Sequence, residues 1–330
     1  MAFVTTGGNK NSTTGANVAV IESIYDKIQL IGSDETPLMS LIGTSTVSNI
    51  KHAWLIDSLA NPTRSPKLEI SDFVGGGEST KQKKENAVEI FTDDIMVSKT
   101  MEKVAMHGGK ELPYQTAKKI KEHKLGIEMA LLGLGRDNNA KVSVFKAPVV
   151  RDTATAGEMA GLFYYLAKGA TTFTSGKKGN VLAFDANSDW SGATTALTWD
   201  KFNEILQQAY NAGETPNDVF VGAKLKGAIN AFASRQLGNE NKYNGAIKSI
   251  ETDFGTINIR LHRMLSDAYG LGDAMIAGNF EYMKNGLLYS TEIEDVTTSK
   301  TATAKRIYTE CTLEVRNADA FVVGVGLKAA

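Results

Sequence analysis

The sequence of 330 residues is poor in the residue types on which most catalytic and metal sites depend. It has one cysteine, Cys311, which excludes a disulfide framework and any cysteine-based zinc site. Its four histidines are scattered, so a histidine-rich metal centre is not expected either. No apolar run approaches the roughly 18 residues that a membrane span needs, and the N-terminus lacks the basic and apolar regions of a secretory signal. We therefore expect a soluble protein of a reducing compartment.

Charge of one sign is also lacking. Lys and Arg total 36 and Asp and Glu total 37, which gives a formal net charge of −1. Proteins whose main task is to grip nucleic acid usually carry a strongly basic domain, so this balance disfavours that class. Hydrophobic content of 42% and charged content of 22% are near globular averages and exclude wholesale disorder. At roughly 100–200 residues per domain, the length predicts about two modules.

The N-terminal part of the chain does not resemble an independent domain. Residues 1–20 are rich in Gly, Ser, Thr and Asn, and this composition predicts a mobile arm. Residues 21–43 are apolar without a long period, and Gly32 and Pro37 divide them into short pieces. This segment is too apolar to remain in water and too short to fold alone. It needs another surface, either in the same chain or in a neighbour.

A long ribbon is predicted next. Residues 51–59 are typical of a strand, and residues 86–100 predict a second strand whose alternation changes near Phe91, as at a bulge. Between them, residues 60–85 contain two prolines, three consecutive glycines and a lysine-rich run. We therefore predict that 51–100 form a two-stranded ribbon with a polar tip. Because an isolated ribbon is marginal in water, it should lie on another surface.

Residues 111–134 predict the longest helix. Pro113 suits its first turn, and Gly133 suits its end. At 1.5 Å per residue such a helix is about 36 Å long. Lys124 interrupts its apolar stripe, whose predicted members are Ala117, Ile120, Ile127, Leu131 and Leu134.

Lysines crowd the first half of this helix, at positions 118, 119, 121 and 124. Over residues 101–150, nine Lys and Arg oppose five Asp and Glu. Two interpretations remain open for this cluster. It is either a solvated helix face or a mildly basic surface that meets a polyanion or an acidic patch on a neighbouring copy.

The rest of the pattern predicts a compact α/β block and a hairpin. The predicted elements are a short helix in 157–168, a Gly/Ser/Thr-rich connection over 169–196, a helix from Thr198 to Gly213, a buried strand at 219–221, a helix over 225–232, and strands at 250–254, 256–265 and 274–277. Asn285-Gly286 predicts a tight turn. The alternation in 307–315, followed by 321–327, predicts a C-terminal hairpin with one buried face.

No motif has the spacing that catalysis needs. Gly176-Lys177-Lys178-Gly179 lacks the Walker spacing, so a charged turn is predicted. His123 is predicted to lie at the surface or in a groove. Cys311 alternates with apolar residues, which predicts a buried strand thiol. Asp93 and Asp94 should point to opposite faces of a strand, which disfavours a shared cation. We expect no catalytic residue, no cofactor and no metal site.

Five motifs occur in a fixed order: ETPL at 35–38, ELPYQTAKK at 111–119, NDVFVG at 217–222, DFG at 253–255 and YTECTLEVRN at 308–317. Each is weak alone, but their order along residues 22–327 resembles the major capsid proteins of tailed double-stranded DNA phages with the Hong Kong 97 fold. Residues 136–196 match least.

The resemblance implies an α+β fold with five named parts. They are an N-terminal arm at 1–50, an extended E-loop at 51–100, a peripheral domain at 101–196 and 288–330, a spine helix within it at 111–134, and an axial domain at 197–287.

The resemblance also implies a function and partners. The chain would assemble with itself, as hexamers and pentamers, into an icosahedral or prolate virion shell around packaged double-stranded DNA, without sequence specificity and without a membrane. Assembly would take place in the cytoplasm of the bacterial host. Further implied partners are a separate scaffolding protein, a portal at one vertex and a decoration protein. Candidate subunit contacts are Leu38, Leu41, Trp54, Lys81, Lys83, Lys84, Lys118 and Lys121. Two alternatives remain, namely another structural phage protein (tail or head decoration) and a soluble α/β enzyme with an unrecognised site.

Overall fold

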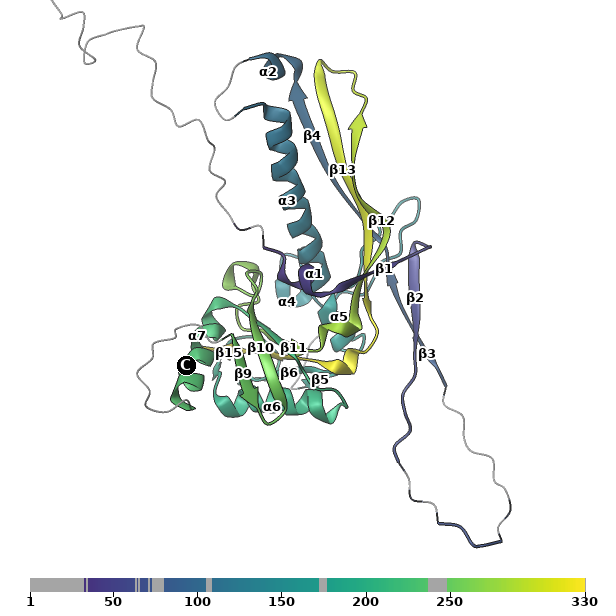
Figure 1. Cartoon of the computed structure of the whole chain (residues 1–330), viewed down its shortest axis with the longest axis vertical. Helices are drawn as coiled ribbons and strands as arrows, with labels where there is room; N and C mark the ends of the chain where they lie inside the picture. The colour runs from purple at the N-terminus through teal and green to yellow at the C-terminus, as the bar shows by residue number, and fades with distance from the viewer. Residues whose placement is uncertain are drawn as a thin grey trace, which may run out of the picture.

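The computed structural model describes residues 33, 35–62, 64, 66–70, 72, 80–104, 109–171, 177–236 and 248–329. The predicted arm at 1–20 lies outside these residues. The described chain forms an elongated part around one long helix, a rounded part around a seven-stranded sheet, and a ribbon that projects from their junction (Figure 1).

The elongated part is a four-stranded sheet covered on one face by helix α3 (Glu111–Leu132). The strand order is β1 (Gly43–Thr46), β12 (Met283–Val296), β13 (Ala302–Val315) and β4 (Glu89–Ser98). β1 runs parallel to β12, and the other neighbours are antiparallel. Near the start of α3, a small cluster joins Leu112 and Ile120 of the helix to Ile95, Val97 and Ile307 of the sheet.

Helix α3 confirms the predicted long helix. Pro113 lies in its first turn, and Gly133 ends it with φ of 86°, a left-handed conformation in which glycine carries no steric penalty. Ile127 and Leu131 are buried as predicted. The prediction for Ala117 is wrong, because this residue is exposed while Leu112 and Ile120 make the contacts at that end.

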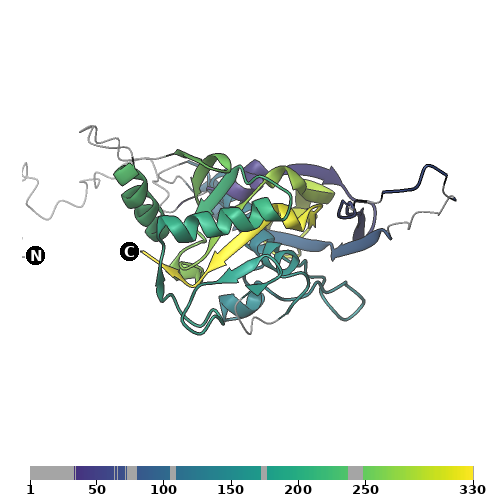
Figure 2. The ribbon, with the colours of Figure 1, turned by 90° about the horizontal axis from the view of Figure 1, so that it is seen from below.

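The rounded part is a mixed seven-stranded sheet. Its order is β5 (Lys177–Lys178), β6 (Val181–Ala183), β14 (Phe321–Val325), β11 (Met275–Gly278), β8 (Asp218–Val221), β10 (Gly255–Leu261) and β9 (Ser249–Thr252). Helices α6 (Trp199–Asn211) and α7 (Ala223–Gln236) pack beside it, and α6 lies across β14 and β11 (Figure 2). Both helices were predicted from sequence, and Thr198 caps α6 by accepting from the amide of Lys201 at 3.4 Å.

The remaining elements are short. They are α1 (Pro37–Leu41), α2 (Lys99–Lys103), α4 (Ala140–Ser143), α5 (Leu162–Leu166), the 3-10 turns η1 (Asp267–Tyr269), η2 (Phe280–Tyr282) and η3 (Ala318–Ala320), the pair β7 (Thr195–Ala196) and β15 (Leu327–Lys328), and the ribbon strands β2 (Lys51–Ile56) and β3 (Gln82–Ala87).

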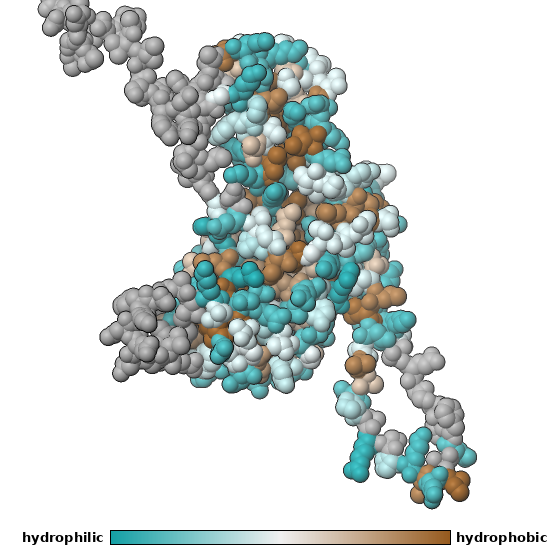
Figure 3. Space-filling view, in the orientation of Figure 1, coloured by the Kyte–Doolittle hydropathy of each residue, from teal (hydrophilic) through white to brown (hydrophobic). Residues whose placement is uncertain are grey.

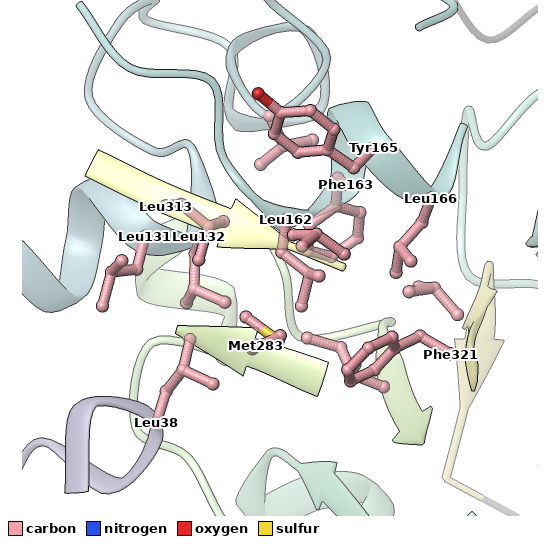
Figure 4. Packing of buried hydrophobic residues seen from close by; sticks show 14 of the residues in the cluster. Leu38, Leu131, Leu132, Leu162, Phe163, Tyr165, Leu166, Met283, Leu313 and Phe321 are labelled. Carbon is pink, nitrogen blue, oxygen red and sulfur yellow. The ribbon is translucent and has the colours of Figure 1, made fainter. Parts of the chain in front are cut away.

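The largest hydrophobic core lies where the two parts meet. Its side chains come from α1, α3, α5 and strands of both sheets, so both parts of the molecule contribute to it (Figure 4). Leu38, Leu131, Phe163 and Phe321 are among its members and are at most 1% exposed. The apolar segment before residue 43 thus finds its surface, over its described residues, in its own chain.

The predicted ribbon is confirmed for its first strand, at 51–59, and wrong for its second, at 86–100. β2 and β3 pair antiparallel from Lys51 with Ala87 to Ile56 with Gln82. From Glu89 onward, β4 instead pairs with β13 in continuous register, without a bulge at Phe91. The alternation of apolar residues changes in this region because the chain leaves the ribbon and enters the four-stranded sheet at the buried Val88.

Two predictions for the C-terminal part are wrong. Residues 321–325 do not return along 307–315, because β13 pairs with β12 and β4 while β14 joins the other sheet. Near its end β13 is buried on both faces, so Glu314 is covered as well as Leu313. Asn285-Gly286 is not a turn but lies inside β12, where a Cβ on Gly286 would approach Val47 to 2.7 Å.

Candidate assembly surfaces

The ribbon is the part of the described chain whose apolar residues are least covered. Leu55 is 66% exposed, Leu59 99%, Leu68 82% and Ile70 94%. The space-filling view shows hydrophobic residues at the far end of the ribbon, away from the body (Figure 3). Singly exposed apolar residues are common on proteins, but several gathered on one projecting segment indicate an interaction site.

The base of the ribbon is anchored firmly to the body. Trp54 is 8% exposed, and its indole Nε1 donates to the carbonyl oxygen of Val315 at 2.9 Å. The Tyr165 ring lies beside the indole, and its hydroxyl donates to the carbonyl of Glu85 at 2.9 Å. Burial raises the pKa of Tyr165 far above its usual value, so the hydroxyl remains a donor. The ribbon therefore leaves the body from a fixed position.

Asn86 adds a second anchor at the same base. Its amide nitrogen donates to the carbonyls of Ala160 at 3.1 Å and Leu313 at 2.8 Å, and its oxygen accepts from the amide of Ala160 at 2.9 Å. The side chain is 1% exposed. A buried amide with several partners in fixed positions tolerates few other residue types.

Glu314 joins three segments on the other side of the base. Its carboxylate accepts from the Ser45 hydroxyl at 3.0 Å and from Arg316 Nε at 2.9 Å, and it lies 3.4 Å from His52 Nε2. Burial alone would raise the pKa of Glu314, but the hydrogen bonds from Arg316 and Ser45 and the positive charges outweigh it and lower this pKa. From its place in β13, the ionised carboxylate thus binds β1 and lies close to β2.

The lysines of α3 are partly neutralised within the chain. Lys119 Nζ lies 2.6 Å from Glu122 and 3.9 Å from Asp93, and Lys118 Nζ lies 3.7 Å from Glu122. The hydrogen bond to Glu122 raises the pKa of Lys119, and the same bond lowers the pKa of Glu122. Lys121 is exposed. This face is therefore less basic than the sequence alone indicates.

The prediction for His123 is wrong, because the ring is buried at 2% exposure between α3 and the sheet. Its Nδ1 lies 2.9 Å from Asp93, and its Nε2 lies 2.8 Å from the Thr309 hydroxyl. Asp93 faces the helix and Asp94 faces the other way, toward Arg306 Nε at 2.7 Å, as the strand alternation predicted. The signal available in the sequence was the inward phase of Asp93, which calls for a polar partner on the covering helix.

The described residues include no metal-binding cluster and no activated cysteine. No group of three His, Cys, Asp or Glu side chains there could hold a metal ion. Cys311 is fully buried, as predicted, and burial raises the pKa of its thiol well above the usual value, so it is not activated as a nucleophile. Within the described ranges, every helix is too short or too polar to cross a membrane.

The eight candidate contact residues fall into two groups. Leu38 and Trp54 are buried within their own chain, and Leu41 is half-buried against the main core. The lysines retain exposed surface on the ribbon and on α3; they are Lys81, Lys83, Lys84, Lys118 and Lys121. Sequence reasoning missed Leu59, Leu68 and Ile70, although apolar residues in a polar segment were a visible signal.

Several solved structures are similar to this chain over nearly its whole length. A capsid protein structure from a native GTA particle matches with a TM-score of 0.61 at 11% identity and covers 97% of this chain and 99% of that one. A structure from Mycobacterium phage Bobi matches with a TM-score of 0.59 at 10% identity, covering 94% and 96%. The encapsulin SrpI complex from Synechococcus elongatus PCC 7942 matches with 0.57 at 10% identity, covering 93% of each. The expected Hong Kong 97 fold is confirmed.

Sequence comparison identifies the family. The major capsid protein of Escherichia phage Phieco32 is 28% identical over 142 residues, which are 42% of this chain and 39% of that relative. The match therefore spans less than half of the length of this curated relative. A model of the SU10 major capsid protein family matches residues 4–328, almost the whole sequence. The chain belongs to the SU10 major capsid protein family.

Proposed function

We propose that this chain is the subunit of a phage head, which assembles with copies of itself, as hexamers and pentamers, into a closed shell around packaged double-stranded DNA. Proteins of its family are structural capsid proteins rather than enzymes. The observation that carries the proposal is the ribbon, whose base is fixed to the body while its apolar residues are left bare. A segment of this kind gains stability by lying on a neighbouring subunit.

We divide the subunit as the resemblance implies, with one refinement. The arm comprises residues 1–50, the E-loop is carried by the ribbon within 51–100, and the axial domain at 197–287 surrounds the axes of the hexamers and pentamers. The sheet of the axial domain also takes strands from outside this range, namely β5, β6 and β14. The peripheral domain, 101–196 and 288–330, contains α3 as its spine.

Charged contacts complete the proposed interfaces. Lys81 and Lys83 at the ribbon, with Lys84 beside them, and Lys118 and Lys121 on α3 contact acidic residues of neighbouring copies. DNA is enclosed without sequence-specific recognition, which fits a chain with a net charge of −1. A separate scaffolding protein, a portal at one vertex and a decoration protein are the other partners, and assembly takes place in the cytoplasm of the bacterial host.

The ribbon can be tested with a variant that keeps its length and its buried base. Replacing Leu55, Leu59, Leu68 and Ile70 with Ser removes the exposed apolar surface without touching the buried base. We expect a folded subunit with native circular dichroism and an unchanged melting temperature that forms no shells in electron micrographs. The matched control replaces the neighbouring polar residues Asn61, Lys67 and Glu69 with Ser, and it should still assemble.

Particle size tests the proposal as a whole. Protein produced with and without the neighbouring phage genes would be measured by electron microscopy and scattering. Closed shells are the expected result, at least in the presence of a scaffolding protein. Normal shells from the four-Ser ribbon variant would refute only the proposed role of the ribbon, and the capsid function would stand. Compact monomers or dimers under every condition would refute the capsid function.

A further inference from the structure

A fully buried carboxylate, Glu128, lies where three distant segments of the chain meet. It belongs to the second half of α3 and is 0% exposed. α1 contacts it from one segment of the chain. The turn at residues 262–265, which follows β10 and which we call the axial turn, contacts it from another. Because a buried carboxylate is costly unless its oxygens are hydrogen-bonded, the donors around Glu128 are essential to this site.

Three donors share the two carboxylate oxygens. Oε1 accepts from the amide of Leu38 at 2.7 Å and lies 2.9 Å from His262 Nε2. Oε2 accepts from the amide of Met39 at 2.8 Å. These two amides open α1 and have no partners within their own helix. The carboxylate thus holds the first turn of α1 with both oxygens and the axial turn with one.

The hydrogen bonds of His262 define its orientation. The amide of Met264 donates to Nδ1 at 3.2 Å, so Nδ1 is an acceptor. Nε2 therefore carries the ring hydrogen and donates the hydrogen bond to Glu128. The ring is 2% exposed and packs edge-on against Phe220 of β8. The next residue, Arg263, makes an exposed ion pair with Glu35 at 2.9 Å. The axial turn and the segment before α1 therefore contact each other directly as well as through Glu128.

Sharing one oxygen makes the two contacts interdependent. If His262 moves away, Oε1 loses one of its two donors, and the buried charge is less well compensated. The closed state, in which α1 covers the Glu128 carboxylate, is then less stable. Local opening of α1, which lets water reach the carboxylate, becomes more favourable. Movement of the axial turn is thereby transmitted to the N-terminal segment.

We propose that Glu128 couples residues 36–42 to the axial turn that carries His262, so that displacement of this turn from α3 releases the N-terminal segment. This is a conformational device within one subunit. Its use in an assembled shell rests on the proposed function, but the coupling itself does not require assembly.

Two substitutions of His262 separate the coupling from a general loosening. His262→Gln places an amide nitrogen where Nε2 lies and keeps the donor to Glu128. His262→Asn places an oxygen where Nδ1 lies, keeps the contact with the Met264 amide, and cannot reach Glu128. The two variants are therefore matched, and each retains one of the two hydrogen bonds of the ring.

Amide hydrogen exchange of the full-length, unassembled subunit gives the readout. We expect His262→Asn to raise the exchange rates of the Leu38 and Met39 amides by roughly tenfold, and His262→Gln to leave them close to wild type. Glu128→Gln should raise the same rates. Glu122→Gln, at a half-exposed position on the same helix, should not. Amides within α6 report whether the whole subunit has been destabilised.

Each other outcome overturns the coupling. Unchanged exchange at residues 38 and 39 in His262→Asn would mean that the axial turn does not influence α1. An equal rise in the Asn and Gln variants, or an equal rise in α6, would mean that loss of the ring simply loosens the subunit. Because exchange is measured without assembly, a failure of shell formation would refute the proposed function and leave this result intact.

Discussion

Glu89, at the start of β4, is a carboxylate whose charge works against the fold. Burial raises its pKa, although the amide of Met159 donates to Oε2 at 2.9 Å and opposes this rise. The negative charge of Glu158 raises the pKa further. The folded state therefore binds the Glu89 proton more tightly than the unfolded chain does, and stability falls as the pH rises from the ordinary value of 4.5 through the raised value.

Replacing Glu89 with Gln should stabilise the subunit at neutral pH. The amide oxygen can still accept from Met159, while the cost of burying a charge is removed. We expect a higher melting temperature than wild type at pH 7 and a difference that disappears once the pH falls below the ordinary value for a glutamate. Glu281→Gln, an exposed change, is the control. An equal or lower melting temperature at pH 7 would contradict the sign of this effect.

Trp54 tests a single hydrogen bond at the base of the ribbon. Trp54→Phe keeps an aromatic ring but removes the donor to the Val315 carbonyl. We expect a loss of roughly 1–3 kcal/mol in the free energy of unfolding, measured by urea denaturation. Hydrogen exchange should become faster in β2 and β3 and stay unchanged in α6. Equal protection of the ribbon in the variant would show that Tyr165 and Asn86 suffice to anchor it.

At the scale of elements, α3 connects the separate parts of the subunit. Its first half packs on the four-stranded sheet through Ile120 and His123, and its second half enters the main core through Ile127 and Leu131. The helix thus contributes to two different cores along its length, through side chains spaced three or four residues apart. Ala117 lies on its exposed face.

A pair of aspartate substitutions on α3 tests these faces. Leu131→Asp places a charge in the main core and should lower the free energy of unfolding by several kcal/mol, about the cost of removing a buried leucine or more. Ala117→Asp places the same residue on the exposed face and should cost less than about 1 kcal/mol. Thermal and urea unfolding measure both. Similar effects at the two positions would mean that the helix presents a different face to the core.

At the scale of the whole molecule, the subunit departs from a compact body because the ribbon projects from it (Figure 1). A compact chain of this length has a radius of gyration of about 20 Å. Small-angle scattering from unassembled subunits should give a larger value. Replacing residues 58–80 with a short Gly-Ser turn, which keeps β2 and β3, should reduce it. A wild-type value near that of the compact body would mean that the ribbon folds back in solution.

The location of β2 and β3 also limits which residues of the ribbon can be deleted. A deletion of 62–85 would remove most of β3 and its pairing with β2. Loss of assembly by such a variant would report a damaged base as well as a missing tip. The turn that replaces 58–80 leaves Asn86 and Trp54 in their contacts, so its effect belongs to the tip.

The sequence by itself determined the elements whose signals are local. The period of apolar residues with its flanking glycines predicted α3, and Thr198 with the stripe after it predicted α6. Aromatic and β-branched content predicted β2, and alternation predicted a buried Cys311. These features depend on residues a few positions apart, and they hold in any tertiary setting that covers the apolar face. A two-stranded ribbon with a tip unfit for a core was also predicted within 51–100, although its second strand is β3 and not the predicted strand at 86–100.

Only the tertiary structure decided which elements are partners. Asn285-Gly286 has the composition of a turn, but β1 and β13 pair on either side of it and keep it in a strand. Residues 321–325 could have paired with 307–315 nearby, yet they complete a second sheet between β6 and β11. Glu128 and His262 are 134 positions apart and meet only in the folded chain. Burial of apolar faces and compensation of buried charge are contributed by distant segments, and a local pattern does not contain them.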